Sequence, residues 1–243
     1  MVTNLAYFFE TARKVRGGKA VWVKDSNGEA RGNVLLGGTI LNPNKGFGKL
    51  WAAQLVQYMP SQGCLIFRSF ALKTSQASAV ATEYVINADG YSDMPEVGMV
   101  LMVAPDALTV TTATADTTTG EVSYTTADYT GQSAKVTAVE YDEANEKVTI
   151  TLDNTLGALD AGVILVEAQG TAKSASAKVL VPNPNTFVEK DEELLPTEGY
   201  GFQNANYSIS TVYNKQAWIP RMQPLPKYVL AKNKSLIDGI FWI

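Results

Sequence analysis

The first apolar residues of the chain recur every three or four positions, which is the spacing of one helix face. This stripe consists of Leu5, Phe8, Phe9, Ala12 and Val15, and Gly17-Gly18 follows it as a helix terminator. A second, shorter stripe contains Trp51, Leu55, Tyr58 and Met59 and ends at Pro60. The sequence therefore predicts two short helices before Pro60.

Over much of the remaining chain, apolar and polar residues alternate, which is the period of a strand with one buried face. This alternation predicts two hairpins: 20–23 with 33–36 around Asn27-Gly28, and 135–141 with 147–152 around a turn at 142–146. Further strands are predicted at 64–72, 82–88, 98–104 and 163–168, between Gly, Asn, Asp and Pro residues. The predicted fold class is mainly β.

The composition changes at Pro105, after which ten threonines lie between Thr109 and Thr130. Threonine is β-branched and suits exposed strand positions, so this stretch is compatible with strand or loop. Together with the hairpin that follows, it predicts a small all-β module, a barrel or a sandwich, over residues 105–175. Residues 1–104 are then a β-rich N-terminal domain that contains the one or two short helices.

The last part of the chain, 176–243, combines prolines with large aromatic residues. It holds six of the ten prolines, which favour an extended conformation over the interior of a sheet. We therefore predict an extended C-terminal arm that binds neighbouring subunits to one another. Its large aromatic side chains would be buried in those contacts, and we call them assembly anchors. These anchors are Tyr213, Trp218, Tyr228, Phe241 and Trp242. A chain that lacks residues 214–243 is expected to stay soluble and to lose assembly.

The net charge of −4 conceals an uneven distribution along the chain. Residues 1–73 hold ten basic and three acidic side chains, whereas residues 74–134 hold eight acidic and no basic ones. An ordinary solvated surface would explain this distribution of charge. Subunits that contact one another through oppositely charged regions would explain it as well. Nucleic-acid binding is the less favoured explanation, because the isoelectric point is about 5.0 and no recognition motif occurs.

Several kinds of chemistry are excluded by the residues that the sequence lacks. It has no histidine and a single cysteine, Cys64, so Ser-His and Cys-His catalysis and thiolate clusters are excluded within one chain. Cys64 opens an apolar run and is interpreted as a small buried hydrophobe. The longest apolar run, 97–104, is far shorter than the roughly 20 residues of a membrane span. We therefore predict no membrane association.

Carboxylates are the remaining candidates for a reactive or metal-binding site. The pairs Asp89/Asp93 and Asp142/Glu143 lie in turn-like contexts, where aspartate is favoured for backbone geometry alone. The acidic run from Glu189 to Glu193 lacks the spacing of a calcium loop, and a solvated acidic face explains it better. The sequence therefore predicts no catalytic residue, no cofactor and no metal site.

Two segments resemble virion structural proteins of tailed bacteriophages, of the head-fibre or capsid-decoration type. The first is KVTAVEYDEANEKVTITLDNTLGALDAGVILVEAQG at 135–170, which is similar to the small barrels of such proteins. The second is AWIPRMQPLPKYVLAKNKSLIDGIFWI at 217–243, similar to endings in which a proline-containing linker and a short helix precede an apolar terminus. The resemblance implies a non-enzymatic role in icosahedral assembly, often with trimeric fibres or knobs on the capsid.

From this resemblance we expect a non-enzymatic component of a virion, assembled in the host cytoplasm. Its expected partners are other copies of itself, as a trimer, and capsid or other virion proteins. One alternative is a carbohydrate-binding or host-adhesion module of a phage particle, in which Trp22, Trp51 and Trp218 stack on sugars. A second alternative is a carboxylate-based hydrolase, which needs an Asp/Glu pair that converges in a deep pocket.

Overall fold

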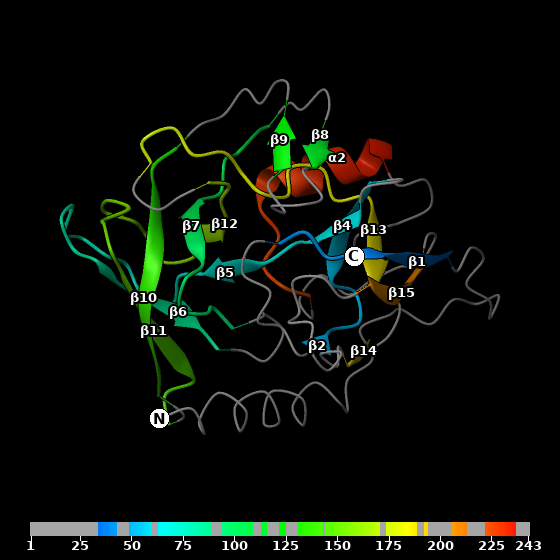
Figure 1. The fold of residues 1–243 in the computed structure, drawn as a ribbon. Coiled ribbons are helices and arrows are strands. Elements are labelled where there is room, and N and C mark those ends of the chain that lie inside the picture. The colour runs from blue at the N-terminus through cyan, green and yellow to red at the C-terminus, as the bar shows by residue number, and fades with distance from the viewer. Residues whose placement is uncertain are drawn as a thin grey trace.

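A computed structural model describes the larger part of the chain, from Val34 to Leu236. The described residues are 34–42, 49–59, 63–88, 94–108, 113–115, 122–124, 131–142, 144–170, 174–188, 192–193, 206–212 and 222–236. Figure 1 shows that they form mainly antiparallel β-structure with one short helix, α2 (Lys227–Leu236). The prediction of a mainly β fold is therefore confirmed.

The larger sheet has six strands in the order β5-β12-β7-β10-β11-β6. Their bounds are Ser69–Ala71 (β5), Ile164–Glu167 (β12), Val100–Val103 (β7), Ser133–Asp142 (β10), Lys147–Leu152 (β11) and Glu83–Asn87 (β6). All six strands supply buried side chains to a single apolar cluster, so the sheet curls around a common core. We call this cluster the inner core; it includes Phe70, Tyr84, Leu101, Val136, Ile150 and Leu165.

The two edge strands of this curled sheet meet at a single point. Leu72, just after β5, forms an isolated antiparallel bridge with Ile86 of β6, and the Lys73 amide donates to the Val85 carbonyl at 2.8 Å. One bridge is not a ladder, so the described strands stop short of a closed barrel.

The second sheet has five strands in the order β1-β15-β13-β3-β4. Their bounds are Val34–Thr39 (β1), Asn206–Val212 (β15), Thr186–Val188 (β13), Leu55–Met59 (β3) and Gly63–Ile66 (β4). Its edges also approach each other, because Ile40 forms a parallel bridge with Cys64. Two small two-stranded sheets pair β2 (Lys49–Leu50) with β14 (Glu192–Glu193), and β8 (Ala113–Ala115) with β9 (Val122–Tyr124).

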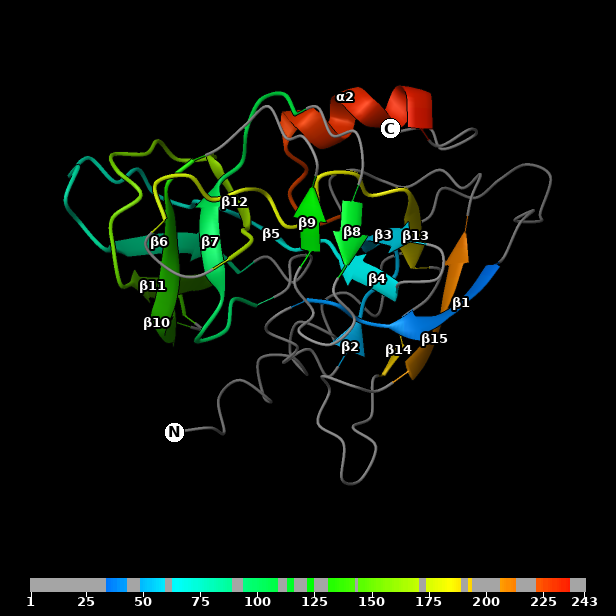
Figure 2. The same ribbon diagram turned by 45° about the horizontal axis from the view of Figure 1, so that its top comes forward.

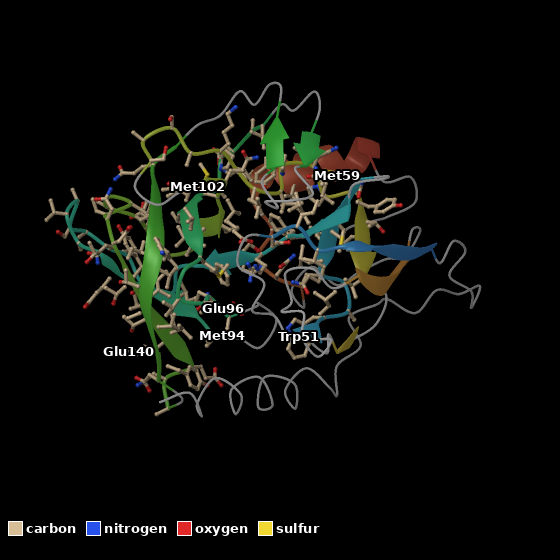
Figure 3. All side chains as sticks on the ribbon, viewed as in Figure 1. Trp51, Met59, Met94, Glu96, Met102 and Glu140 are labelled. Carbon is tan, nitrogen blue, oxygen red and sulfur yellow. The ribbon has the colours of Figure 1, made fainter. Side chains whose placement is uncertain are left out.

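A second apolar cluster, the intersheet core, joins the two sheets and α2. It receives Leu55, Leu65 and Phe187 from the five-stranded sheet, Met102 and Val166 from the six-stranded sheet, and Tyr228 and Val229 from α2. Met59 and Met102, which Figure 3 labels, enter it from different sheets. Figure 2 shows the two sheets side by side with α2 along one end.

Several predicted elements are confirmed. The hairpin of 135–141 with 147–152 is β10–β11, in which Asp142 pairs with Lys147, and 82–88, 98–104 and 163–168 contain β6, β7 and β12. The segment 64–72 forms two strands, β4 and β5, separated by Phe67 and Arg68. The Thr-rich segment contains β8 and β9. The predicted helix at 5–16 and strand at 20–23 lie outside the described residues.

The predicted helix at 51–59 is wrong, because Leu55–Met59 is strand β3. Leu55 belongs to the intersheet core and Val56 to a third apolar cluster on the other face of the sheet. A short strand that is buried on both faces has no alternation, and its pattern resembles that of a buried helix. Ala53, with φ of 65°, turns the chain just before the strand.

The described strands cross the boundaries predicted between the three parts of the chain. β7 lies before Pro105, yet it pairs with β10 and β12, which follow it. Within the segment predicted to be an extended arm, β13 and β15 pair with β3 and β1, and α2 packs on the intersheet core. The described parts of all three segments therefore share sheets or a core.

Candidate functional site

The most polar buried position in the described structure lies where the two sheets meet. Arg68 is in the connection between β4 and β5, Glu167 ends β12, and Asn42 follows β1 shortly after its bridge to β4. All three side chains are at most 2% exposed. We call this group the junction triad.

The junction triad is held by direct hydrogen bonds. Arg68 Nε donates to Glu167 Oε2 at 3.0 Å, and Arg68 Nη2 donates to Oε1 at 2.8 Å. Asn42 Nδ2 donates to the same Oε2 at 2.9 Å and to the Ile66 carbonyl at 2.9 Å, while its Oδ1 accepts from the Ile66 amide at 2.8 Å. Both carboxylate oxygens are therefore occupied by donors from this chain.

This arrangement suits a structural role, in which the three side chains hold the two sheets together. A buried ion pair is tolerated only when its charges are paired and hydrogen-bonded, and here the fork of the guanidinium meets both carboxylate oxygens. Next to Arg68, the Ser69 hydroxyl donates to the Pro224 carbonyl, which ties the segment before α2 to the same place. The triad thus joins the two sheets, and Ser69 joins the approach to α2 to the same place.

Of the four candidate reactive carboxylates, the structure describes Asp142. Asp142 lies at the end of β10, where it accepts hydrogen bonds from the side chain and the amide of Asn145. The Asn145 side chain is the main reason why the pKa of Asp142 is lowered. A general acid in a glycosidase needs a raised pKa, so Asp142 does not suit that role. Asp89, Asp93 and Glu143 lie outside the described residues.

The acidic run that begins at Glu189 is described only at Glu192 and Glu193, whose backbones pair with Leu50 and Lys49 of β2. In the described part of the chain, no three acidic, histidine or cysteine residues gather in a way that could hold a metal ion. No described helix is long and apolar enough to cross a membrane. Cys64 is 3% exposed in β4, as predicted for a small buried hydrophobe.

Of the five predicted assembly anchors, the structure describes Tyr228. It is 1% exposed, and its hydroxyl donates to the Val181 carbonyl at 3.0 Å, so it packs in the core of its own chain. Tyr213, Trp218, Phe241 and Trp242 lie outside the described residues. Among the tryptophans considered for sugar stacking, Trp51 is 2% exposed and therefore hidden from a ligand, while Trp22 and Trp218 are not described.

The stretch of sequence that contains the six-stranded sheet is acidic, and two of its described apolar side chains are largely exposed. Residues 69–170 contain fifteen acidic and three basic side chains, and Glu140, labelled in Figure 3, is an exposed example on β10. Val80, between β5 and β6, is 81% exposed, and Val97, before β7, is 63% exposed. Among the described acidic residues of this stretch, Glu83, Asp106, Glu140, Glu146 and Asp160 are exposed.

The pattern of the sequence did not single out the junction triad. Its one signal is Arg68, a charged residue inside the apolar run CLIFRSFAL, because a charge in a buried strand needs a partner. Glu167 and Asn42 carry no comparable signal. No protein-family model, curated protein or solved structure matches this chain.

Proposed function

We propose that this chain is a non-enzymatic structural component of a virion, of the head-fibre or capsid-decoration type. In this role it binds other copies of itself and capsid or other virion proteins. The proposal starts from the resemblance of residues 135–170 and 217–243 to such proteins. One observation carries it further: both segments take part in the same packed body.

Residues 135–170 supply the paired strands β10 and β11 and strand β12, and α2, from within 217–243, packs on the intersheet core. The junction triad then joins both sheets by hydrogen bonds at a buried position. Two curled sheets with a shared core and a buried ion pair are expected to form a rigid body. Such a body supports a structural role in a particle. The separation of positive and negative segments supports contacts between unlike surfaces of neighbouring subunits.

The experiment concerns the apolar end of the chain. Deletion of 214–243 is too severe, because it also removes Met222, Leu225, Tyr228 and Val229 from the intersheet core. The sharper variant is Phe241→Ser/Trp242→Ser, which leaves these core residues in place. We expect the purified chain to form an oligomer, a trimer by the resemblance, whose mass in light scattering falls toward that of the monomer in this variant.

A matched control is Val80→Ser, which removes one exposed apolar side chain elsewhere and is expected to leave the mass of the oligomer unchanged. The proposal is contradicted if the unmodified chain is a monomer at every concentration. The role of the apolar end is contradicted if the Phe241→Ser/Trp242→Ser variant assembles like the unmodified chain.

A further inference from the structure

One segment lies where the two sheets meet without belonging to either of them. We call residues 222–236, which end in α2, the strap. Met222, Leu225, Tyr228 and Val229 of the strap belong to the intersheet core, and each is at most 8% exposed. The other members of this core come from described segments before the strap, so those segments form a seat that the strap fills. Figure 2 shows α2 along one end of the two sheets.

The strap is attached to its seat by apolar packing and by hydrogen bonds from side chains. None of the described strands pairs with it. The Ser69 hydroxyl donates to the Pro224 carbonyl, and the Tyr228 hydroxyl donates to the Val181 carbonyl at 3.0 Å. The strap also follows β15, the last strand of the chain. Its transfer to another seat would therefore leave every strand pair of both sheets in place.

The strap and the segments around its seat carry opposite charges. Residues 222–236 contain three lysines and no acidic residue, whereas residues 69–170 contain fifteen acidic and three basic side chains. Lys227 of the strap places its Nζ 3.0 Å from Asp106 Oδ2. The strap of a second copy would meet the same negative charge, so the approach of the two chains is favoured by attraction.

We propose that straps are exchanged between copies of this chain, so that the strap of one copy fills the seat of a neighbour. Every copy carries both parts, so each contact described above is reproduced between chains. The covalent connection opposes exchange, because nine residues, 213–221, tie the strap to β15. A short connection gives the strap an effective concentration of about millimolar at its own seat. We therefore expect exchange where copies are concentrated, as they are in a particle.

This inference rests on the self-association in the proposed function and assigns a segment to it. Reciprocal exchange joins two copies, and exchange around a ring joins three, the number that the resemblance implies. Exchange also gives Tyr228 two roles at once. Its side chain is buried in an apolar core, as the structure shows, and that core belongs to the neighbouring subunit, as an assembly anchor requires.

Cross-linking between two full-length variants tests the exchange. Asp106→Cys and Lys227→Cys each place one thiol at the contact, where the native side chains are 79% and 74% exposed, while the native Cys64 is buried. The two variants are unfolded, mixed, refolded together and treated with a short bis-maleimide. Neither chain carries both new thiols, so a covalent dimer of the two variants requires a contact between chains. We expect its yield to rise with the protein concentration during refolding.

The matched control pairs Lys227→Cys with Glu140→Cys, at another exposed acidic residue. Glu140 lies seven residues along β10 from Ser133, which opposes Met102, so it is about 23 Å from that end of β7. This pair is expected to give no more dimer than each variant alone. A chain with both Asp106→Cys and Lys227→Cys, refolded at low concentration, is expected to give a cross-linked monomer, because the dilute strap fills its own seat.

Two results would overturn the inference. A dimer yield that is no higher than in the control shows that the strap stays on its own chain. The absence of any cross-link in the chain with both cysteines shows that the strap does not reach the seat. If light scattering of the unmodified chain still gives an oligomer in either case, the proposed function stands without exchange. Circular dichroism of each variant confirms that the fold is retained.

Discussion

Arg68 and Glu167 lie 99 positions apart in the sequence and form a two-point ion pair where the two sheets meet. The contact joins the connection between β4 and β5 to the end of β12. Because Asn42 donates to the same carboxylate, three distant segments depend on one buried charge. The relative placement of the sheets is thus specified by a polar contact as well as by the apolar intersheet core.

The first prediction concerns the removal of one charge from this pair. Arg68→Met leaves the Glu167 carboxylate buried without its cation, which is expected to lower the free energy of unfolding by about 3–5 kcal/mol. The double variant Arg68→Met/Glu167→Leu removes both charges and should recover most of that loss. Denaturant unfolding of the three proteins measures the difference.

The control for this prediction is the exposed ion pair between Lys227 and Asp106, with Nζ 3.0 Å from Oδ2 and side chains 74% and 79% exposed. Lys227→Met is expected to cost less than about 1 kcal/mol, because water screens the pair. A double variant that is no more stable than Arg68→Met would show that packing, and not the uncompensated charge, determines the loss.

The second prediction concerns the hydroxyl of Tyr84 in β6. It accepts a hydrogen bond from the buried amide of Leu156 at 2.7 Å and lies 3.1 Å from the Gly157 carbonyl. Tyr84→Phe leaves that amide without its acceptor, so we expect a loss of about 1–3 kcal/mol in denaturant unfolding. Thr137→Val is a useful comparison, because the Thr137 hydroxyl donates to the Thr151 carbonyl at an exposed position and its loss should matter less. Equal losses would contradict this explanation.

Local patterns predicted part of this fold for a clear physical reason. In β10–β11, alternating residues face the inner core and the solvent, so the period of two is visible in the sequence. The turn between them is short, so the pairing partner is also close in the sequence. Strand β3 is buried on both faces and lacks this alternation, so its sequence pattern wrongly predicts a helix.

Contacts between distant segments could not be predicted in this way. The sequence gives no sign that β1 pairs with β15, in which Val34 opposes Thr211, while the hairpin predicted between 20–23 and 33–36 involves residues outside the described ones. The register of such a pair depends on the whole core and not on a nearby turn. The same holds for Glu167, whose sequence neighbours give no sign that its partner is Arg68. The pairing of residues that lie far apart in the sequence therefore could not be predicted from local patterns.

The third prediction tests whether Tyr228 serves its own chain or a partner. Its burial in the intersheet core implies that Tyr228→Ala lowers the free energy of unfolding by about 3–5 kcal/mol, as for other large-to-small core substitutions. Thermal unfolding of the dilute chain gives the measurement. Ala231→Ser, at an exposed position of the same helix, is the control and should have little effect. An unchanged unfolding temperature in Tyr228→Ala would restore the role of an anchor for a partner.

The last prediction concerns acid stability and the turn between β10 and β11. Asn145 Nδ2 donates to Asp142 Oδ2 at 2.7 Å and its amide donates to Oδ1 at 3.2 Å, while Lys147 Nζ lies 3.5 Å from Oδ2. The side-chain bond from Asn145 is the largest cause that lowers the pKa of Asp142, partial desolvation opposes it, and the backbone bond and Lys147 add to the lowering. The folded state therefore favours the ionised carboxyl.

A lowered pKa contributes stability above the ordinary aspartate pKa of about 3.9, and this contribution is lost as the pH falls through the lower pKa of the folded state. Asn145→Ala removes the main cause, so the unmodified chain should unfold at a higher temperature than the variant near neutral pH. The difference should shrink as the pH is lowered through the acid range. In the background of Asp142→Asn, which has no charge to titrate, the effect of Asn145→Ala should not vary with pH. If the difference between the unmodified chain and Asn145→Ala stays constant down to about pH 2, the Asp142 charge does not stabilise the turn.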